Sequence, residues 1–299
     1  MQPQLSFTGN NNHADNWVYD VKGNLLNDGL KSYTYDAEGR IIALNGQLAY
    51  AYDAEGRRVA KYSASTITAS YILGLGGEQV TELDASGNWK HSNAFAGGRM
   101  VATYEGPAGQ AAAGYHFHLT DWLGTKRMQV SPGGGQDETC TSYPFGDGLN
   151  CTGVDATEHH FTQKERDAES GLDYFFARYY SSGLARFMTP DWAAKPAAVP
   201  YATFGDPQTL NLYAYVNNNP NTGIDVDGHL GLPGPMGSEM NPNQDGNVAA
   251  AQGAAPYNPQ KDLYQQTNAN WQAQQQSSSG HHCCPAIFPE NPVTYCIPV

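Results

Sequence analysis

The first half of the chain consists of short stretches with the two-residue periodicity of β-strands, separated by turn-forming residues. Arg57, Val59 and Lys61, for example, follow one another at intervals of two, which places them on one face of an extended strand. The 33 glycines supply the positive backbone angles of tight turns, and the 19 tyrosines favour strands. We therefore predict an all-β protein with many short strands.

A short internal repeat organises these strands. The sequence "YDVKGN" begins at Tyr19, and "YDAEGR" begins at Tyr35 and again at Tyr52. The short and nearly constant distance between these tyrosines suits one β-hairpin, with the turn between Asp and Gly, as at Asp36 and Gly39. Because a single hairpin cannot bury its apolar face, successive units must pair into a longer antiparallel sheet that curls.

This repeat resembles the YD repeats of the Rhs family. Further along, "HFHLTDWLGTKRMQV" (116–130) is similar to a family segment of the form His-x-Asp-x-Leu-Gly-Ser-x-Arg, and "SYPFGD" (142–147) is similar to a family turn. The stretch "FTQKERDAESGLDYFFARYYSSGLARFMTPDW" (161–192) resembles the Rhs repeat-associated core, and "NLYAYVNNNPNTGIDVDG" (211–228) resembles the motif that closes it. The resemblance covers about residues 15–229.

The resemblance implies a β-sheet wound into a hollow shell, with a core domain that plugs one end and precedes a variable C-terminal region. In bacterial relatives that region is often a toxin, which is held inside the shell and detached by self-cleavage. We expect four parts: a flexible segment at 1–14, shell repeats at 15–135, the core at 136–229 and a variable tail at 230–299. Family shells are much longer, so the chain resembles the last repeats plus the plug.

Three residues match the family's self-cleavage set: Arg178, Asp191 and Asp225. Two neighbouring carboxylates suit the reaction because repulsion keeps one protonated as an acid while the other activates water. An arginine beside them fixes their geometry and stabilises developing negative charge. The resemblance places the cleavage region at Gly228, His229 and Leu230.

A purely structural interpretation stands beside the catalytic one. Cleaving relatives usually have Pro where this chain has Val226, and commonly have Leu where it has His229. In the structural interpretation, Arg178 and Asp191 form a buried ion pair and residues 225–228 form a turn. Both interpretations make Arg178 and Asp191 internal partners, because buried charges persist when they are paired or functional.

Aromatic residues surround these charges in the stretch "FFARYYSSGLARFMTPDW" (175–192). We expect Phe175, Phe176, Tyr179 and Tyr180 to form the apolar centre of the core domain.

Charge and motifs limit the partners. A net charge of −13 with only 16 Lys and Arg argues against nucleic acid, since no basic face can be assembled. No segment approaches the roughly 18 apolar residues that span a bilayer. The first residues show no signal peptide.

We predict a secreted or cell-surface protein with an unknown export route, whose partners are its own tail, upstream repeats, secretion machinery or an immunity protein. The rival class is a non-enzymatic adhesive module that binds carbohydrate or protein.

Neither a cofactor nor a metal ion is predicted. The five cysteines are irregularly spaced and define no disulfide framework. In "HHCC" (281–284), adjacent side chains point to opposite sides and no second ligand pair follows. The segment "NPNQDGN" (241–247) resembles a calcium loop but has Gln252 in place of the bidentate Glu. His116, His118, His159 and His160 are expected to be ordinary packed or surface residues.

The tail at 230–299 differs in composition from the rest of the chain. It contains a single cation, Lys261, and runs such as "WQAQQQSSSG". Few large apolar residues remain to offset the entropy of ordering, so we expect most of the tail to be disordered. A nuclease payload would show basic residues and a His or acidic cluster, and neither is evident.

Overall fold

The computed structural model describes residues 5–9, 11–106, 114–192, 202, 205–229 and 231–233, the last three by their backbone alone. All of them belong to the first of two compact units, Met1–Met240; the second is Asn241–Val299. The predicted disordered tail, including the segments at 241–247 and 281–284, therefore lies outside the described residues apart from this short stretch of backbone. Leu230 also lies outside them.

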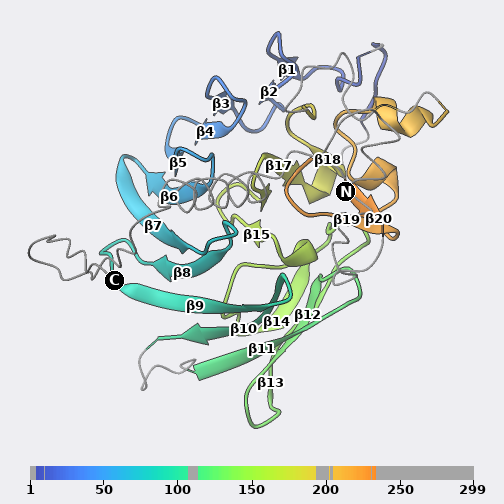
Figure 1. The fold of residues 1–299 in the computed structure, drawn as a ribbon. Helices are drawn as coiled ribbons and strands as arrows, with labels where there is room; N and C mark the ends of the chain where they lie inside the picture. Colours follow the sequence, from blue (N-terminus) through green and yellow to red (C-terminus); the bar gives the residue numbers. More distant parts are fainter. Residues whose placement is uncertain are drawn as a thin grey trace, which may run out of the picture. The chain divides into compact units, whose positions relative to one another are not determined.

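Twelve strands form one antiparallel sheet in which each strand pairs with its predecessor in the sequence. The strands are β3 (Tyr33–Tyr35), β4 (Ile41–Leu44), β5 (Leu48–Tyr52), β6 (Arg58–Ser63), β7 (Thr66–Leu73), β8 (Gln79–Leu83), β9 (Trp89–Ala96), β10 (Arg99–Glu105), β11 (Gly114–Thr120), β12 (Lys126–Val130), β13 (Gln136–Thr141) and β14 (Asn150–Gly153). Figure 1 shows this order as a continuous change of colour from blue to green. The predicted antiparallel sheet of successive hairpins is confirmed from Tyr33 onward, and it continues past residue 135 to Gly153; the first repeat, predicted to belong to it, lies in a separate two-stranded sheet.

The described residues also form three smaller sheets. Strands β15 (Glu165–Arg166), β16 (Asp173–Phe175), β17 (Arg178–Ser181) and β18 (Arg186–Phe187) form a four-stranded sheet. Strand β1 (Val18–Tyr19) pairs with β2 (Leu25–Asn27), and β19 (Gly223–Asp225) pairs with β20 (Gly231–Pro233). The helical elements of the described residues are short 3₁₀ turns: η1 (Phe161–Gln163), η2 (Ser182–Leu184), η3 (Pro207–Leu210) and η4 (Val216–Asn218). The all-β prediction is therefore confirmed for this part of the chain.

The repeated Asp-x-x-Gly sequence forms each turn in the same way. At Asp36, the backbone carbonyl accepts a hydrogen bond from Gly39 N (3.2 Å), and the carboxylate accepts from the backbone N of Glu38 and Arg40. Gly39 has a φ of +82°, which favours glycine. The side chain of Arg40 then donates to the same carboxylate (2.7 Å). Asp and Arg of the repeat are thus parts of the turn.

The tyrosines of the second and third repeats each join one hairpin to the preceding one. The hydroxyl of Tyr35 donates to the carbonyl of Leu25 (2.8 Å), and the hydroxyl of Tyr52 donates to the carbonyl of Ile41 (2.6 Å). A buried hydroxyl needs such a partner. The spacing of the tyrosines therefore matches the spacing of the hairpins.

One face of the large sheet is buried and strongly polar. The charged or ionisable side chains of the sheet that are less than a tenth exposed include Arg58, Lys61, Glu82, His91, Lys126 and Glu138. Arg58 and Lys61 form ion pairs with Glu165 and Asp167 of the segment between β14 and β16. Ion pairs, rather than apolar contacts alone, therefore join the sheet to this segment.

The described residues also form two apolar clusters. The first contains residues of both the repeats and the later segment: Leu25, Tyr33, Ile41, Leu44, Tyr50, Leu172, Tyr174, Tyr179 and Met188. The second contains Phe161, Phe175, Tyr180, Phe187 and Tyr215. Of the four rings predicted to form the centre of the core, Phe175, Tyr179 and Tyr180 are buried and Phe176 is half-buried.

Candidate functional site

Three separate elements supply the predicted site residues. Arg178 begins β17, directly after the turn at Phe176, whose φ is +59°. Asp191 follows β18 within "TPDW", and its backbone N donates to the carbonyl of Leu212 (2.8 Å). Asp225 ends the short strand β19. The later segments are therefore folded back onto the hairpin that carries Arg178.

Arg178 contacts both aspartates through the same nitrogen. Its Nη2 lies 3.0 Å from Asp191 Oδ2 and 3.6 Å from Asp225 Oδ2. The guanidinium carbon lies 3.7 Å from the centroid of the Phe187 ring, and Arg178 is 2% exposed. The structure thus brings the three predicted residues together in a largely dry environment.

The same guanidinium holds the backbone of the predicted cleavage region. Arg178 Nε donates to the carbonyl of Gly228, and Nη2 donates to the carbonyl of His229 (2.9 Å). A third donation, from Nη1, reaches the carbonyl of Leu212 (3.0 Å). The His229 carbonyl belongs to the peptide bond between His229 and Leu230. A cation on this oxygen polarises that bond and stabilises an oxyanion formed there.

Asp225 is buried and only partly satisfied. Its Oδ1 accepts hydrogen bonds from the backbone N of Gly228 (2.7 Å) and of His229 (3.1 Å). Its Oδ2 has no hydrogen-bond partner among the described residues, although it faces Arg178. Burial raises the pKa of Asp225 to about 6, against the opposing effect of the Arg178 charge. Part of Asp225 is therefore protonated near neutral pH, and Oδ2 is the oxygen without a hydrogen-bond partner.

Asp191 holds the side chain of His229. Its Oδ1 accepts from the backbone N of Trp192 (2.7 Å) and lies 3.0 Å from His229 Nδ1. The Trp192 and His229 rings meet edge to face, with centroids 4.5 Å apart. The histidine that replaces the family's usual leucine therefore has a defined place in the site.

Sequence reasoning missed Lys164, a buried cation close enough to Asp225 to interact with its charge. Its Nζ donates to the carbonyl of Val226 (2.5 Å) and lies 4.8 Å from the centroid of the Phe176 ring. Burial lowers the pKa of Lys164 to about 8, while Asp225 and Asp227 oppose this shift. Lys164 lies within the core-like stretch 161–192, which was the available signal.

Gly228 fits a space that only glycine can occupy. Its φ is +88°, and a Cβ atom there would lie 2.3 Å from the carbonyl oxygen of Phe175 and 3.0 Å from Arg178 N. Both contacts are with backbone, which cannot move as a flexible side chain can. The identity of residue 228 therefore sets how closely the predicted cleavage region approaches Arg178.

Gly228→Ala should destabilise the protein by clearly more than about 1 kcal/mol, because backbone strain and a backbone clash add. Gly29→Ala is the matched control, since Gly29 has the same φ of +88° and nothing within 4 Å of a Cβ. Thermal unfolding of the two variants measures the difference. Equal melting temperatures would show that the close approach at Gly228 is unimportant for stability.

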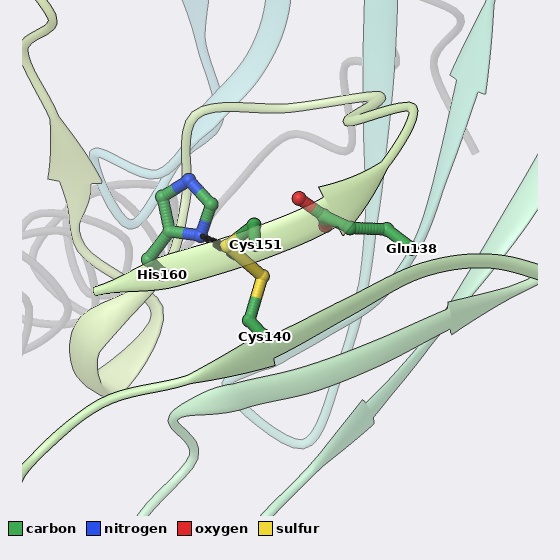
Figure 2. A group of neighbouring side chains, drawn as sticks. All are labelled: Glu138, Cys140, Cys151 and His160. Atoms are coloured by element: carbon green, nitrogen blue, oxygen red, sulfur yellow. Dashed lines mark hydrogen bonds between the residues drawn. A yellow bond between two sulfur atoms is a disulfide. The ribbon is translucent and has the colours of Figure 1, made fainter.

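Sequence reasoning also missed a disulfide between Cys140 and Cys151. The two residues pair directly across β13 and β14, and their Cα atoms are 4.1 Å apart. The signal was the turn at 142–147, since a hairpin around it aligns the two cysteines. His160 and Glu138 lie next to this disulfide (Figure 2).

Three of the four histidines that the sequence predicts to be ordinary residues are packed side chains with polar partners. His116 Nδ1 lies 2.9 Å from Asp137 Oδ2, and His118 Nε2 lies 3.0 Å from Thr103 Oγ1. His159 Nδ1 lies 2.8 Å from Thr157 Oγ1. Burial lowers the pKa of His118 and of His159 to about 3.

Sequential hairpins that form one long sheet, joined by buried charges to a Tyr-rich later segment, define a repeat protein of the β-shell class. Residues 9–221 match the teneurin YD-shell family, and the chain belongs to this family. The matched residues include Arg178 and Asp191 and end before Asp225.

Curated relatives include nucleases. The tRNA3(Ser)-specific nuclease WapA of Bacillus spizizenii is 27% identical over 225 residues, and the tRNA nuclease WapA of Bacillus subtilis strain 168 is 27% identical over 231 residues. Each match covers 71% of this chain and 9% of the relative. The chain thus corresponds to a small part of these proteins.

Solved structures of Tc toxins share the fold. A chain in the Tc holotoxin pore of Photorhabdus luminescens has a TM-score of 0.52 and 21% identity, over 72% of this chain and 11% of that one. A chain in the TcdB2-TccC3-Cdc42 crystal structure has a TM-score of 0.55 and 19% identity, over 80% of this chain and 11% of that one.

Among the described residues, no helix is long and apolar enough to cross a bilayer.

Proposed function

We propose that this chain is the last shell repeats and the Rhs-type core of a secreted or cell-surface, toxin-like protein, and that it cuts itself between His229 and Leu230. The family membership and the likeness to Tc toxin shells support the first part. The geometry around Arg178 supports the second. The resulting tail, 230–299, would remain enclosed by the shell until it is released.

The observation that carries the cleavage proposal is the position of one guanidinium. Arg178 donates to the carbonyl of His229 and contacts both candidate carboxylates. A hydrolytic site needs these three functions: polarisation of the carbonyl, a base for water and an acid for the leaving amine. A structural ion pair alone needs no hydrogen bond to the carbonyl of the cleavage region.

The roles follow from the environment of each group. Asp191, paired with Arg178, accepts a proton from water as the water oxygen attacks the carbonyl carbon of His229. Arg178 stabilises the oxyanion. Asp225 donates the proton on Oδ2 to the amide nitrogen of Leu230, and the C–N bond breaks. The products are a carboxylate at His229 and an amine at Leu230.

The purified wild-type chain should run as two species on a denaturing gel. Mass spectrometry should find masses for residues 1–229 and 230–299, and the two pieces should elute together under native conditions if the tail is enclosed. Separate elution of the two pieces would contradict only the enclosure of the tail, not the cleavage. Detection of the full-length mass and no other would contradict the cleavage.

An aromatic surface favours a second candidate function, adhesion. Trp89, Tyr104 and Tyr115 follow one another across β9, β10 and β11, with ring centroids 5.4 and 4.7 Å apart, and all three are at least 36% exposed. Exposed aromatic rings suit contact with carbohydrate or protein. If the chain remains whole, this non-enzymatic function is the better account.

A further inference from the structure

Four potential metal ligands lie on or next to the hairpin of β13 and β14, away from the site around Arg178. Glu138, Cys140, Cys151 and His160 each offer one ligand atom, and these atoms all lie within 4.8 Å of one another. His160 Nδ1 lies 3.9 Å from both cysteine sulfurs. Figure 2 shows the imidazole of His160 and the carboxylate of Glu138 next to the disulfide, with an imidazole nitrogen facing the sulfurs.

A second carboxylate orients the imidazole. His160 Nε2 lies 3.0 Å from Asp155 Oδ2, which leaves Nδ1 for the sulfurs. Histidines that bind metals typically donate their other ring nitrogen to a carboxylate in this way. Asp155 and Glu138 each also form an ion pair with the buried Lys126, which fixes their positions.

The disulfide by itself explains neither group. It joins two directly paired residues of one hairpin and needs no histidine or carboxylate. Glu138 is 1% exposed and His160 is 7% exposed, so both groups lie beside the disulfide in a buried, polar environment. Two thiolates, an imidazole and a carboxylate are, however, a suitable ligand set for zinc.

We propose that Cys140, Cys151, His160 and Glu138 bind one Zn²⁺ ion when the disulfide is reduced. A thiol reductant supplies two electrons and two protons to break the S–S bond, and Zn²⁺ then displaces the two thiol protons. Sulfurs bonded to each other cannot both ligate one tetrahedral ion, so disulfide and metal exclude each other. The hairpin is thus cross-linked by metal in a reducing compartment and by a disulfide in an oxidising one.

Co²⁺ is the test probe, because its thiolate complexes absorb visible and near-ultraviolet light. The protein used in the test carries Cys283→Ser, Cys284→Ser and Cys296→Ser, so that the tail cysteines do not bind the metal. After anaerobic reduction we expect one Co²⁺ per chain with a tetrahedral spectrum, and stoichiometric displacement by Zn²⁺. The oxidised chain should bind none.

Single variants then assign the ligands. Cys140→Ser and Cys151→Ser should each weaken the thiolate bands and the binding, because one of the two thiolates is lost. Asp155→Asn should weaken binding by about 10–100-fold through the orientation of His160. His160→Gln should weaken it further, whereas His159→Gln, which alters the neighbouring buried histidine, should leave affinity unchanged. Circular dichroism of each reduced variant shows that it is folded.

Two results would overturn the proposal. One is a reduced, folded chain that binds no Co²⁺ or Zn²⁺ at micromolar concentrations. The other is binding that His160→Gln and His159→Gln affect equally, which would place the metal elsewhere. Neither result depends on whether the chain cleaves itself.

Discussion

Asp225→Asn is expected to leave the chain in one piece. The substitution preserves the shape of the side chain, and the amide oxygen can still accept from Gly228 N and His229 N, as Oδ1 does now. The amide nitrogen has no acidic proton to give to the leaving amine of Leu230. Loss of a general acid costs about 10²–10⁴-fold in rate, which turns a chain that is fully cut on folding into one that is uncut.

Two further substitutions complete this comparison. Asp191→Asn should also leave an intact chain, because the base for water is lost. Asp227→Asn is the matched control: Asp227 is exposed, its Oδ1 accepts from His229 N (3.2 Å), and an amide oxygen can replace that acceptor. Intact-mass measurement of denatured protein distinguishes all three. Cleavage that persists in Asp225→Asn would remove this residue from the mechanism.

The rate of cleavage should fall as the pH rises through about 6. The pKa of Asp225 is raised to about 6 by burial, so its donating, protonated form predominates below that pH and is lost above it. Uncut chain can be isolated from inclusion bodies in denaturant and refolded by dilution at pH 5 to 8, with samples stopped in detergent. A rate that rises over this range would show that ionised Asp225 is the active form.

The repeats predicted the sheet well because their information is local. Each Asp-x-x-Gly turn is formed by neighbours in sequence, as Asp36 shows with Glu38, Gly39 and Arg40. The short, nearly constant period of the repeat then sets the order of pairing. Local turns of this kind specify a meander without any long-range contact.

The long-range polar contacts were beyond such reasoning. The strand pattern makes Lys61 only one position in an alternating strand, yet its Nζ lies 2.6 Å from Glu165 Oε1 and 2.6 Å from Asp167 Oδ1, both far along the chain. Lys164 likewise reaches the cleavage region through a carbonyl contact that no spacing indicates. The juxtaposition of Arg178, Asp191 and Asp225 was predictable only through the family resemblance.

Arg58→Met is expected to destabilise the protein by about 3–5 kcal/mol, because it removes one partner of a buried ion cluster. Arg58 is fully buried, and its guanidinium nitrogens lie 2.7 Å from both Glu165 Oε2 and Asp167 Oδ2. The substitution leaves the two buried carboxylates with Lys61 as their cation within hydrogen-bond distance. The guanidinium also lies over the Tyr174 ring, 4.3 Å from its centroid, a contact that methionine only partly replaces.

Arg57→Met is the control for this substitution. Arg57 is the preceding residue and pairs with Asp53 and Glu55, but its side chain is 29% exposed, so its loss should cost less than about 1 kcal/mol. Denaturant unfolding of both variants in the Asp225→Asn background compares chains of equal length. Equal losses would show that the ion cluster contributes no more than a surface pair.

The pH dependence of the Arg58→Met loss tests its electrostatic origin. Arg58 and Lys61 hold the pKa of Glu165 well below its usual range despite burial. A depressed pKa contributes stability that is complete above the unfolded pKa of about 4.3 and is lost as the pH falls toward the folded value. The difference between the parent chain and Arg58→Met should therefore be largest at neutral pH and should shrink below about pH 4. A difference that stayed constant down to pH 3 would instead assign the loss to packing around the Tyr174 ring.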